Sequence, residues 1–203
     1  MNDFNIKKIT VLIFCIAMAI SCGQKSKKID KFQIAEDYID ALNASDYNQV
    51  VELFLDSIRF NEMDYIRTYT KEDYHSLFQW DSVFGPKYKI LDLREDGDNL
   101  HLKVSKVCDR ILFLQNSPFI THEIMKIKHG AIQRIDIAEY VDFNDSLWAA
   151  NRENLVSWIN EHHPELKGFI YDQTKEGALK FQKAMELYRN KKDSIPVQEN
   201  IKS

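Results

Sequence analysis

The stretch KYKILDLREDGDNLHLKVSKV, residues 87–107, contains the pattern that decides the fold. Leu100, Leu102 and Val104 alternate with polar residues, which is the period of two of a strand with one buried face. The dipeptide Asp96-Gly97 ahead of them is typical of a tight hairpin turn. The stretch therefore predicts two antiparallel strands joined by a short turn.

Beyond this hairpin the apolar series changes phase. Val107, Ile111 and Phe113 fall on odd numbers, whereas the series before them falls on even numbers. A shift of one residue within a strand is what a β-bulge produces, so the strand is expected to continue and to bend at residues 105–106. In this arrangement Asp109 shares the face of the apolar residues.

Two further turns are predicted, at 116–118 and 129–130, because Asn, Ser, Pro, His and Gly gather there. They divide the rest of this region into strands at 119–128 and 131–141. The sequence thus predicts a meander of at least four antiparallel strands with one marked bend.

Helical periodicity precedes the meander. Apolar residues recur at helical spacing over 30–43 and again after Ser45, which is expected to cap the second helix. A brief strand at 57–61 follows, and then a third helix, capped by Thr70 and closed by Gly85-Pro86. These helices are expected to cover the concave face of the bent sheet.

Helical periodicity returns after the last strand. One helix is closed by Pro164 and another begins near Thr174, so residues 144–195 are predicted to form a helical extension, with a polar tail at 196–203. The predicted fold class is α+β. It combines a cone-like domain over 30–143, in which helices cover a bent antiparallel sheet, with this carboxy-terminal extension.

Composition excludes several classes of protein. The 203 residues are 44% hydrophobic with only 6 Gly and 4 Pro, which argues against a disordered or collagen-like chain. Lys and Arg number 27 against 31 Asp and Glu, so the net charge is −4 and no nucleic-acid partner is expected. The sequence lacks a glycine-rich phosphate loop, a Cys-x-x-Cys pair and a Gly-x-Ser-x-Gly turn, so no cofactor is predicted, and neither are phosphoryl transfer, redox chemistry and serine hydrolysis.

The first residues have the pattern of an export signal. Lys7 and Lys8 precede an apolar run at 9–20, which would rise about 18 Å as a helix, less than the ~30 Å of a membrane core. The run closes on Ala19-Ile20-Ser21-Cys22, which resembles the lipobox of bacterial lipoproteins. The resemblance implies removal of a signal peptide, 1–21, and attachment of palmitate-type acyl chains to the new terminal cysteine.

Residues 22–29 then form a predicted flexible tether between a bilayer and the domain. Gly23 stands where inner-membrane lipoproteins commonly carry Asp, so the resemblance implies the periplasmic face of an outer membrane. The alternative is an ordinary secretory signal in which Cys22 is incidental. Cys108 is the remaining thiol of the mature chain, and it is predicted to be a small buried hydrophobe.

The order of the elements is similar to that of a known family. The pattern Ala35-x-x-Tyr38-x-x-Ala41 and the link Ser45-Asp46-Tyr47 fall within two helices that precede a brief strand, a third helix and a long bent meander. This order resembles the nuclear transport factor 2-like cone, also called the polyketide-cyclase-like fold. The resemblance implies a cavity lined by aromatic and a few polar side chains; members include isomerases, dehydratases, cyclases, transport factors and domains that only dimerise.

Four residues are candidates for that cavity. Tyr38, Tyr74 and Trp80 are predicted to line it, and Asp109 is predicted to face it from the bent strand. Burial there would raise the pKa of the Asp109 carboxyl toward the range of a general base. The alternative role for Asp109 is an ion pair with Arg110 or another basic group at the rim of the sheet.

Three functions stay open at this point. The first is a membrane-anchored module without catalysis that binds a small apolar ligand or a protein partner. The second is a small lyase or isomerase with Asp109 as its base, and the third is a structural homodimer that pairs through the outer face of the sheet. No metal site is predicted, because adjacent side chains such as those of His162-His163 point about 100° apart on a helix.

Overall fold

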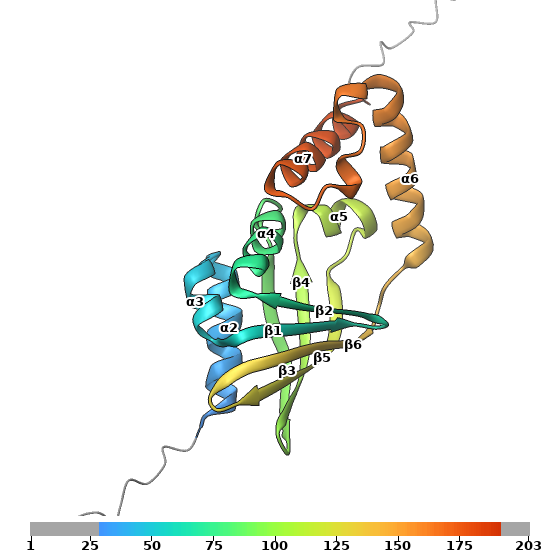
Figure 1. The fold of residues 1–203 in the computed structure, drawn as a ribbon. Coiled ribbons are helices and arrows are strands. Elements are labelled where there is room, and N and C mark those ends of the chain that lie inside the picture. The colour runs from blue at the N-terminus through green and yellow to red at the C-terminus, as the bar shows by residue number, and fades with distance from the viewer. Residues whose placement is uncertain (1–28, 192–203) are drawn as a thin grey trace, which may run out of the picture.

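The computed structural model describes residues 29–191, which form a curved sheet of six strands with helices packed against it (Figure 1). The strand order is β2-β1-β6-β5-β4-β3, and β1 pairs with β6 in parallel, whereas the other neighbours are antiparallel. The sheet is not closed, because β2 and β3 form its two edges. The strands are β1 (Phe54–Glu62), β2 (Tyr65–Thr70), β3 (Lys87–Asp96), β4 (Asn99–Val107), β5 (Phe119–Lys128) and β6 (Ala131–Tyr140).

The helices form two groups. The first three precede the meander in the chain and contact the sheet, whereas the last three gather at one end of the molecule (Figure 1). The helices are α2 (Lys31–Ala44), α3 (Tyr47–Glu52), α4 (Lys71–Ser82), α5 (Asp109–Gln115), α6 (Asp145–His162) and α7 (Lys175–Asn190), with short 3-10 helices η1 (Pro164–Leu166) and η2 (Phe169–Tyr171). Within the described range, none of the helices has the length and hydropathy needed to cross a membrane.

Much of the predicted order is confirmed. Strands β5 and β6 lie where the period of two places them, and Gly97, with a φ of +58°, turns the hairpin between β3 and β4. Thr70 and Thr174 cap α4 and α7, because each hydroxyl accepts a hydrogen bond from the backbone N–H three residues on. The fold is α+β, with a bent sheet covered by helices and a helical extension after it.

The short link between α2 and α3 differs from the prediction in its cap. Ser45 does not cap α3 but ends α2 in the left-handed conformation, with a φ of +54°. Asp46 is the cap of α3, and its carboxylate accepts a hydrogen bond from the N–H of Gln49. Only Ser45 and Asp46 separate the two helices. Ser45 is needed to turn the chain at the end of α2, so Asp46 is the residue left to cap the start of α3.

The strands before α4 are longer than predicted. β1 extends beyond the predicted 57–61 in both directions, and β2 was not predicted. β2 forms an edge of the sheet, where only Tyr69 of its residues is buried. A strand with one buried residue shows no alternation of apolar and polar residues, which is why the period of two does not reveal it.

The predicted bend at residues 105–106 is wrong. β4 ends at Val107, and Asp109–Gln115 forms the helix α5. Ile111 and Leu114 are its buried apolar residues, three apart as on one face of a helix. The register shifts that accompany the curvature of the sheet lie instead in the β3–β4 and β5–β6 pairings and between β1 and β6.

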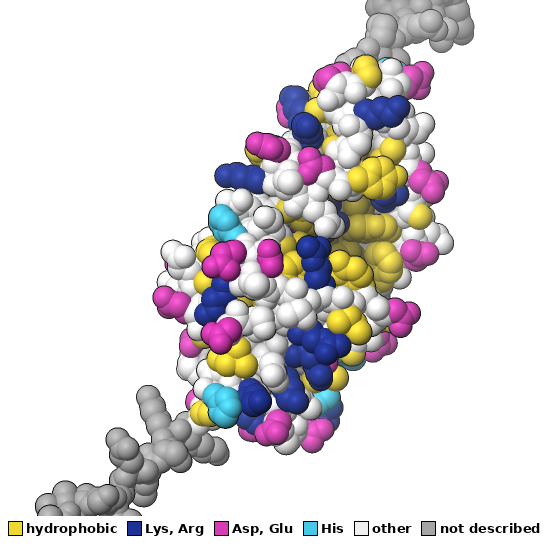
Figure 2. Space-filling model, viewed as in Figure 1, with side chains coloured by type: hydrophobic (Ala, Val, Ile, Leu, Met, Phe, Trp, Pro, Cys, Tyr) yellow, Lys and Arg dark blue, Asp and Glu magenta, His cyan; other side chains and the backbone are white. Residues whose placement is uncertain are grey.

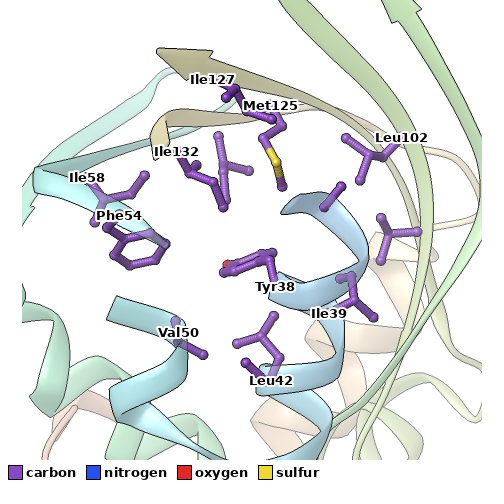
Figure 3. Packing of buried hydrophobic residues seen from close by; sticks show 14 of the residues in the cluster. Tyr38, Ile39, Leu42, Val50, Phe54, Ile58, Leu102, Met125, Ile127 and Ile132 are labelled. Atoms are coloured by element: carbon purple, nitrogen blue, oxygen red, sulfur yellow. The ribbon is translucent and has the colours of Figure 1, made fainter. Parts of the chain in front are cut away.

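Buried apolar residues form two clusters, here called the cone core and the helical core. The cone core lies between the sheet and α2, α3 and α4 (Figure 3). It includes Tyr38, Ile39, Leu42, Val50, Phe54, Ile58, Leu102, Met125, Ile127 and Ile132. The helical core consists of Phe84, Cys108, Ile111, Leu114, Leu155, Ile159, Phe169, Ala178, Phe181, Ala184 and Met185. Cys108 is buried as predicted, and the extension packs on segments that the chain supplies before and within the meander.

Candidate functional site

A cavity of about 530 Å³ extends from the cone core toward the helical core. Its walls come from α2, α4 and the inner face of the sheet, with further side chains from α5 and α6. Aromatic side chains make up much of the wall: Tyr38, Phe60, Tyr65, Tyr69, Tyr74, Phe78, Trp80, Tyr88, Phe119, Tyr140, Phe143 and Trp148. A cavity of this composition favours ligands with an apolar body.

Two tyrosines of the cavity wall interact with each other. The side chains of Tyr38 on α2 and Tyr74 on α4 both line the cavity, and both residues are buried. Burial raises the pKa of each phenol above its ordinary value of 10, so both stay protonated at neutral pH. The pair can donate or accept hydrogen bonds, but neither hydroxyl is a base at neutral pH.

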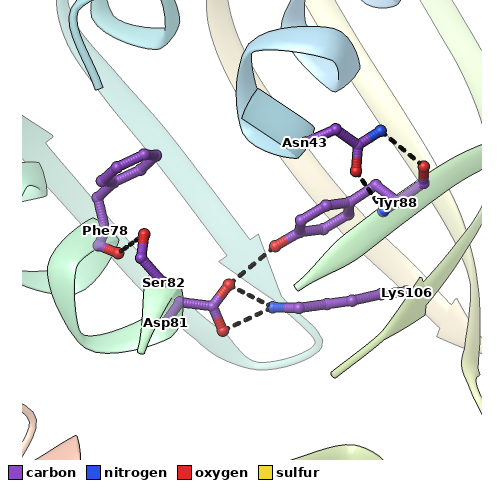
Figure 4. A network of polar contacts seen from close by, with 6 residues as sticks. All are labelled: Asn43, Phe78, Asp81, Ser82, Tyr88 and Lys106. Carbon is purple, nitrogen blue, oxygen red and sulfur yellow. Dashed lines mark hydrogen bonds and ion pairs between the residues drawn. The ribbon is translucent and has the colours of Figure 1, made fainter. Parts of the chain in front are cut away.

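A partly buried ion pair lies in the same cavity wall, between α4 and the sheet (Figure 4). Lys106 Nζ lies 2.9 and 2.8 Å from the two carboxylate oxygens of Asp81, and the Tyr88 hydroxyl donates a 2.9 Å hydrogen bond to Asp81 Oδ2. Burial by itself would raise the pKa of Asp81, but the Lys106 ammonium, with Arg110 and Tyr88, outweighs it and lowers that pKa. Asp81 is therefore an ion-pair partner that stays ionised.

The strand β3 is held in place for this network by a residue of α2. Asn43 donates a 2.9 Å hydrogen bond to the carbonyl oxygen of Tyr88 and accepts a 2.7 Å bond from its backbone N–H (Figure 4). The NH2 group and the carbonyl oxygen of the Asn43 side-chain amide are thus both bonded to the backbone of Tyr88. This fixes the position from which the Tyr88 ring reaches Asp81.

Glu123 is a second cavity carboxylate, and its chemistry is the opposite of that of Asp81. Burial raises the pKa of Glu123, while a 2.7 Å hydrogen bond from the Thr121 hydroxyl and the charge of Lys106 act against this rise. Glu123 has no ion pair among the described side chains, so its carboxyl group favours the neutral form more than an exposed one does.

The structure places three of the four predicted site residues at the cavity. Tyr38, Tyr74 and Trp80 line it, although ligand binding by them stays a prediction. Asp109 does not, because the chain leaves the sheet after Val107 and Asp109 is the exposed first residue of α5. The carboxyl group therefore keeps contact with water, and the prediction that it faces the cavity as a general base is wrong. Its alternative role, an ion pair with Arg110, is not found among the described residues either.

Sequence reasoning missed the charged residues that do line the cavity. Lys106 continues the even-numbered series of Leu102 and Val104 on β4, and Glu123 shares the odd-numbered series of Met125 on β5. Each is a charged residue in phase with a buried apolar series, which is a signal that the sequence contains. Asp81, near the end of a helix, has no comparable signal.

The described residues contain no cluster of three or more His, Cys, Asp or Glu placed to hold a metal ion. The adjacent histidines, His162 and His163, both contact the ring of Trp158 near the end of α6. The His162 ring stacks on Trp158, with centroids 4.9 Å apart, and the His163 ring lies 5.2 Å from the same indole. His163 also lies 3.2 Å from Glu165.

No protein-family model matches the sequence, and no curated protein matches it significantly. Among solved structures, the chain is similar to an NTF2-like protein of unknown function from Cytophaga hutchinsonii, with a TM-score of 0.44, 15% identity, and coverage of 55% of this chain and 90% of that one. It is similar to a candidate ketosteroid isomerase from Kribbella flavida, with a TM-score of 0.43, 14% identity and coverage of 55% and 80%. A candidate polyketide cyclase from Sinorhizobium meliloti gives a TM-score of 0.45, 17% identity and coverage of 51% and 92%.

Proposed function

We propose that this protein is a binding module that holds a small, largely apolar molecule in the cavity of the cone. The observation that carries the proposal is the cavity itself, with its volume of about 530 Å³ and its wall rich in aromatic side chains. Pockets that bind small molecules typically measure about 300–1,000 Å³ and combine apolar walls with a few polar groups. A domain that served only to dimerise would gain stability by filling this space, because each void in a core weakens it.

Catalysis by Asp109 is not part of the proposal. A general base must lie within hydrogen-bond reach of the proton it removes. Asp109 lies outside the cavity lining and is exposed at the start of α5. The carboxylates that do line the cavity have partners, because Asp81 is paired with Lys106, Glu123 accepts a hydrogen bond from Thr121, and Glu62 accepts one from Tyr140.

Binding is tested with the neutral fluorescent probe N-phenyl-1-naphthylamine, titrated into the full chain carrying Cys22→Ser so that no acyl chain is added. Ile137 lines the cavity from β6, and Ile137→Trp is expected to weaken probe binding by about tenfold or more, since the larger side chain takes up the space. The next residue, Ala138, is exposed and outside the lining, so Ala138→Trp is the matched control. Equal affinity in both variants, or no binding by the parent chain, contradicts the proposal.

We further propose that the protein is anchored to a bilayer through acylated Cys22, on the periplasmic face of an outer membrane. This rests on the residues up to Gly23 alone, which lie outside the described part of the chain together with most of the tether, 22–29, and the tail, 196–203. More than one acyl chain is what stable anchoring requires. Cells fed an alkyne analogue of palmitate are expected to label the parent chain and to leave Cys22→Ala unlabelled; labelling of both, or of neither, contradicts the anchor.

Pairing of two copies through the outer face of the sheet stays a prediction. Light scattering of the chain in solution measures its mass and decides between one copy and two. Neither result changes the proposal for the cavity, which a single chain builds from its own residues.

A further inference from the structure

One cation in the cavity wall, Arg110, makes neither an ion pair nor a hydrogen bond with the residues that the structure describes. The guanidinium carbon of Arg110, on α5, lies 4.9 Å from the ring centre of Trp80 and 5.4 Å from that of Trp148. Within residues 29–191 no ion pair or hydrogen bond of this side chain is found, and its Nε is buried without an acceptor. Stacking on two indoles satisfies the faces of the guanidinium but not the N–H groups in its plane.

The unpaired Nε matters because a buried donor without an acceptor is costly. Leaving one unpaired costs about 1–3 kcal/mol, and more when the group is charged. Asp81 does not relieve this, because its carboxylate oxygens accept hydrogen bonds from Lys106 and Tyr88 and none from Arg110 among the described residues. A guanidinium in this state matches an oxyanion group, planar or tetrahedral, in which two oxygens can accept two parallel N–H hydrogen bonds at once.

The surroundings of Arg110 define the rest of the ligand. Phe119, Tyr140 and Phe143 lie in the same cavity wall as Trp148, with neighbouring ring centres 5.2–5.7 Å apart. Figure 2 shows hydrophobic side chains lining a hollow on this face of the molecule, with Lys and Arg side chains beside them. An apolar, ring-containing body would contact these aromatic side chains while its charged group reached the guanidinium.

We propose that the ligand of the cavity is an organic anion, with a ring-containing apolar body in the cone and an oxyanion group held by Arg110. The inference rests on the proposed function, because it requires that the cavity bind a small molecule. It adds the chemical class of that molecule and the residue that selects it. The remaining carboxylates of the wall have partners of their own, since Thr121 donates to Glu123 and the Tyr140 hydroxyl donates to Glu62.

Two probes with the same ring system test this selection. 8-Anilinonaphthalene-1-sulfonate carries an oxyanion group, and N-phenyl-1-naphthylamine is the same skeleton without it. The protein with Cys22→Ser is expected to bind the sulfonate more tightly than the neutral amine. In Arg110→Gln the affinity for the sulfonate is expected to fall about tenfold, while the affinity for the amine stays within about twofold.

A second arginine supplies the matched control. Arg152 lies over the ring of Tyr171, 5.9 Å from its centre, and belongs to neither the cavity wall nor any ion pair among the described residues. Arg152→Gln therefore removes a similar arginine–aromatic contact and is expected to leave both affinities unchanged. Arg110→Lys keeps the charge but loses the planar fork, so it is expected to retain only part of the preference for the sulfonate.

The outcomes separate this inference from the proposed function. If the parent chain binds neither probe, the cavity is not a ligand site and both fail. If it binds the neutral amine at least as tightly as the sulfonate, or if Arg110→Gln keeps the preference, only the inference about the anion is overturned.

A second experiment uses only the parent chain, so it tests the inference even if Arg110→Gln does not fold. 2-Naphthoate and its methyl ester are compared as competitors of the neutral probe. The acid is expected to displace it at about a tenth of the ester concentration, because only the acid offers an oxyanion. Equal potency of acid and ester overturns the inference.

Discussion

The helical core and the cone core differ in how completely they are filled with apolar side chains. The helical core brings together residues from α5, α6, α7 and two loops, and every member is apolar. The cone core is equally apolar where α2 covers the sheet, but beside it lies a cavity of about 530 Å³ with an ion pair, a carboxyl group and a guanidinium in its wall. The difference separates a part of the protein that is closely packed from a part that encloses an open space.

A physical reason connects this difference to the shape of the sheet. Helices can pack on all sides of one another, so the helical core closes around itself. An open, curved sheet can be covered only where helices reach it, and α2 and α3 reach the part nearest Val50 and Ile58 (Figure 3). The part of the sheet that these helices do not cover must either be filled by long side chains or enclose a cavity. Here much of this space is the cavity described above.

The largest effect is expected from damage to the helical core. Phe181 is buried, and the centre of its ring lies 5.6 Å from the ring centre of Phe84 and 5.0 Å from that of Phe169. Phe181→Ala is expected to lower the free energy of unfolding by about 3–5 kcal/mol, because it removes buried surface and leaves a void.

Chemical denaturation followed by circular dichroism measures this loss. Leu179 lies on the same helix and is 47% exposed, so Leu179→Ala is the control, with an expected change within about 0.5 kcal/mol. A loss for Phe181→Ala no greater than that of the control would contradict the view that this core is tightly packed.

A smaller effect is expected from breaking the ion pair of the cavity. Lys106→Met leaves the Asp81 carboxylate without its cation. Breaking a fully buried pair costs about 3–5 kcal/mol, and since about a fifth of each side chain is exposed (18% for Asp81 and 23% for Lys106), a loss of about 2–3 kcal/mol is expected. Lys103→Met, on the same strand but outside the cavity, is the control.

The pH dependence of this loss checks its cause. The pKa of Asp81 is lower in the folded state, so the pair contributes stability above the ordinary Asp pKa, and this contribution is lost as the pH falls through the folded-state pKa. The difference between the parent chain and Lys106→Met is therefore expected to shrink on acidification. A difference that stays constant down to acid pH would point to lost packing rather than a lost ion pair.

The smallest effect, and one of opposite sign, is expected at Glu123. Burial raises the pKa of Glu123, so the folded state binds its proton more tightly than the unfolded chain does. Stability is therefore lost as the pH rises from the ordinary Glu pKa through the folded-state pKa, and Glu123→Gln is expected to be more stable than the parent chain above that range.

Unfolding midpoints measured across acid to neutral pH test this sign. The control is Glu139→Gln, because Glu139 is an exposed residue of β6 whose ion pair with His122 lies at the surface. A stability difference for Glu123→Gln that does not grow with pH would show that burial does not disfavour the carboxylate.

The sequence predicts those strands of the fold that have one buried face and one exposed face. β5 alternates between a buried and a wetter face, and residues 119–128 match the prediction. β2 lies at an edge and is almost wholly exposed, so its residues show no alternation, and it was not predicted. The segment after Val107 was assigned to the wrong element, because a short helix and a bulged strand both bury Ile111.

The candidate site divides in the same way. Tyr38 and Tyr74 were predicted from the apolar faces of their helices and do line the cavity. Asp109 was placed in the wall by extending the strand too far, whereas Lys106 and Glu123 were overlooked although they are in phase with buried residues. Arg110 reaches the cavity because the chain leaves the sheet after Val107 and forms α5. Its guanidinium then lies near the rings of Trp80 and Trp148.

Local spacing by itself determined the class of the fold, the order of most elements and two of the helix caps, since period and capping are properties of neighbouring residues. Only the tertiary structure decided where the sheet curves, which helices close its end and which charges meet inside. Those features depend on contacts between segments far apart in the chain, such as Asp81 with Lys106 and Phe84 with Phe181, and no pattern within a single element contains them.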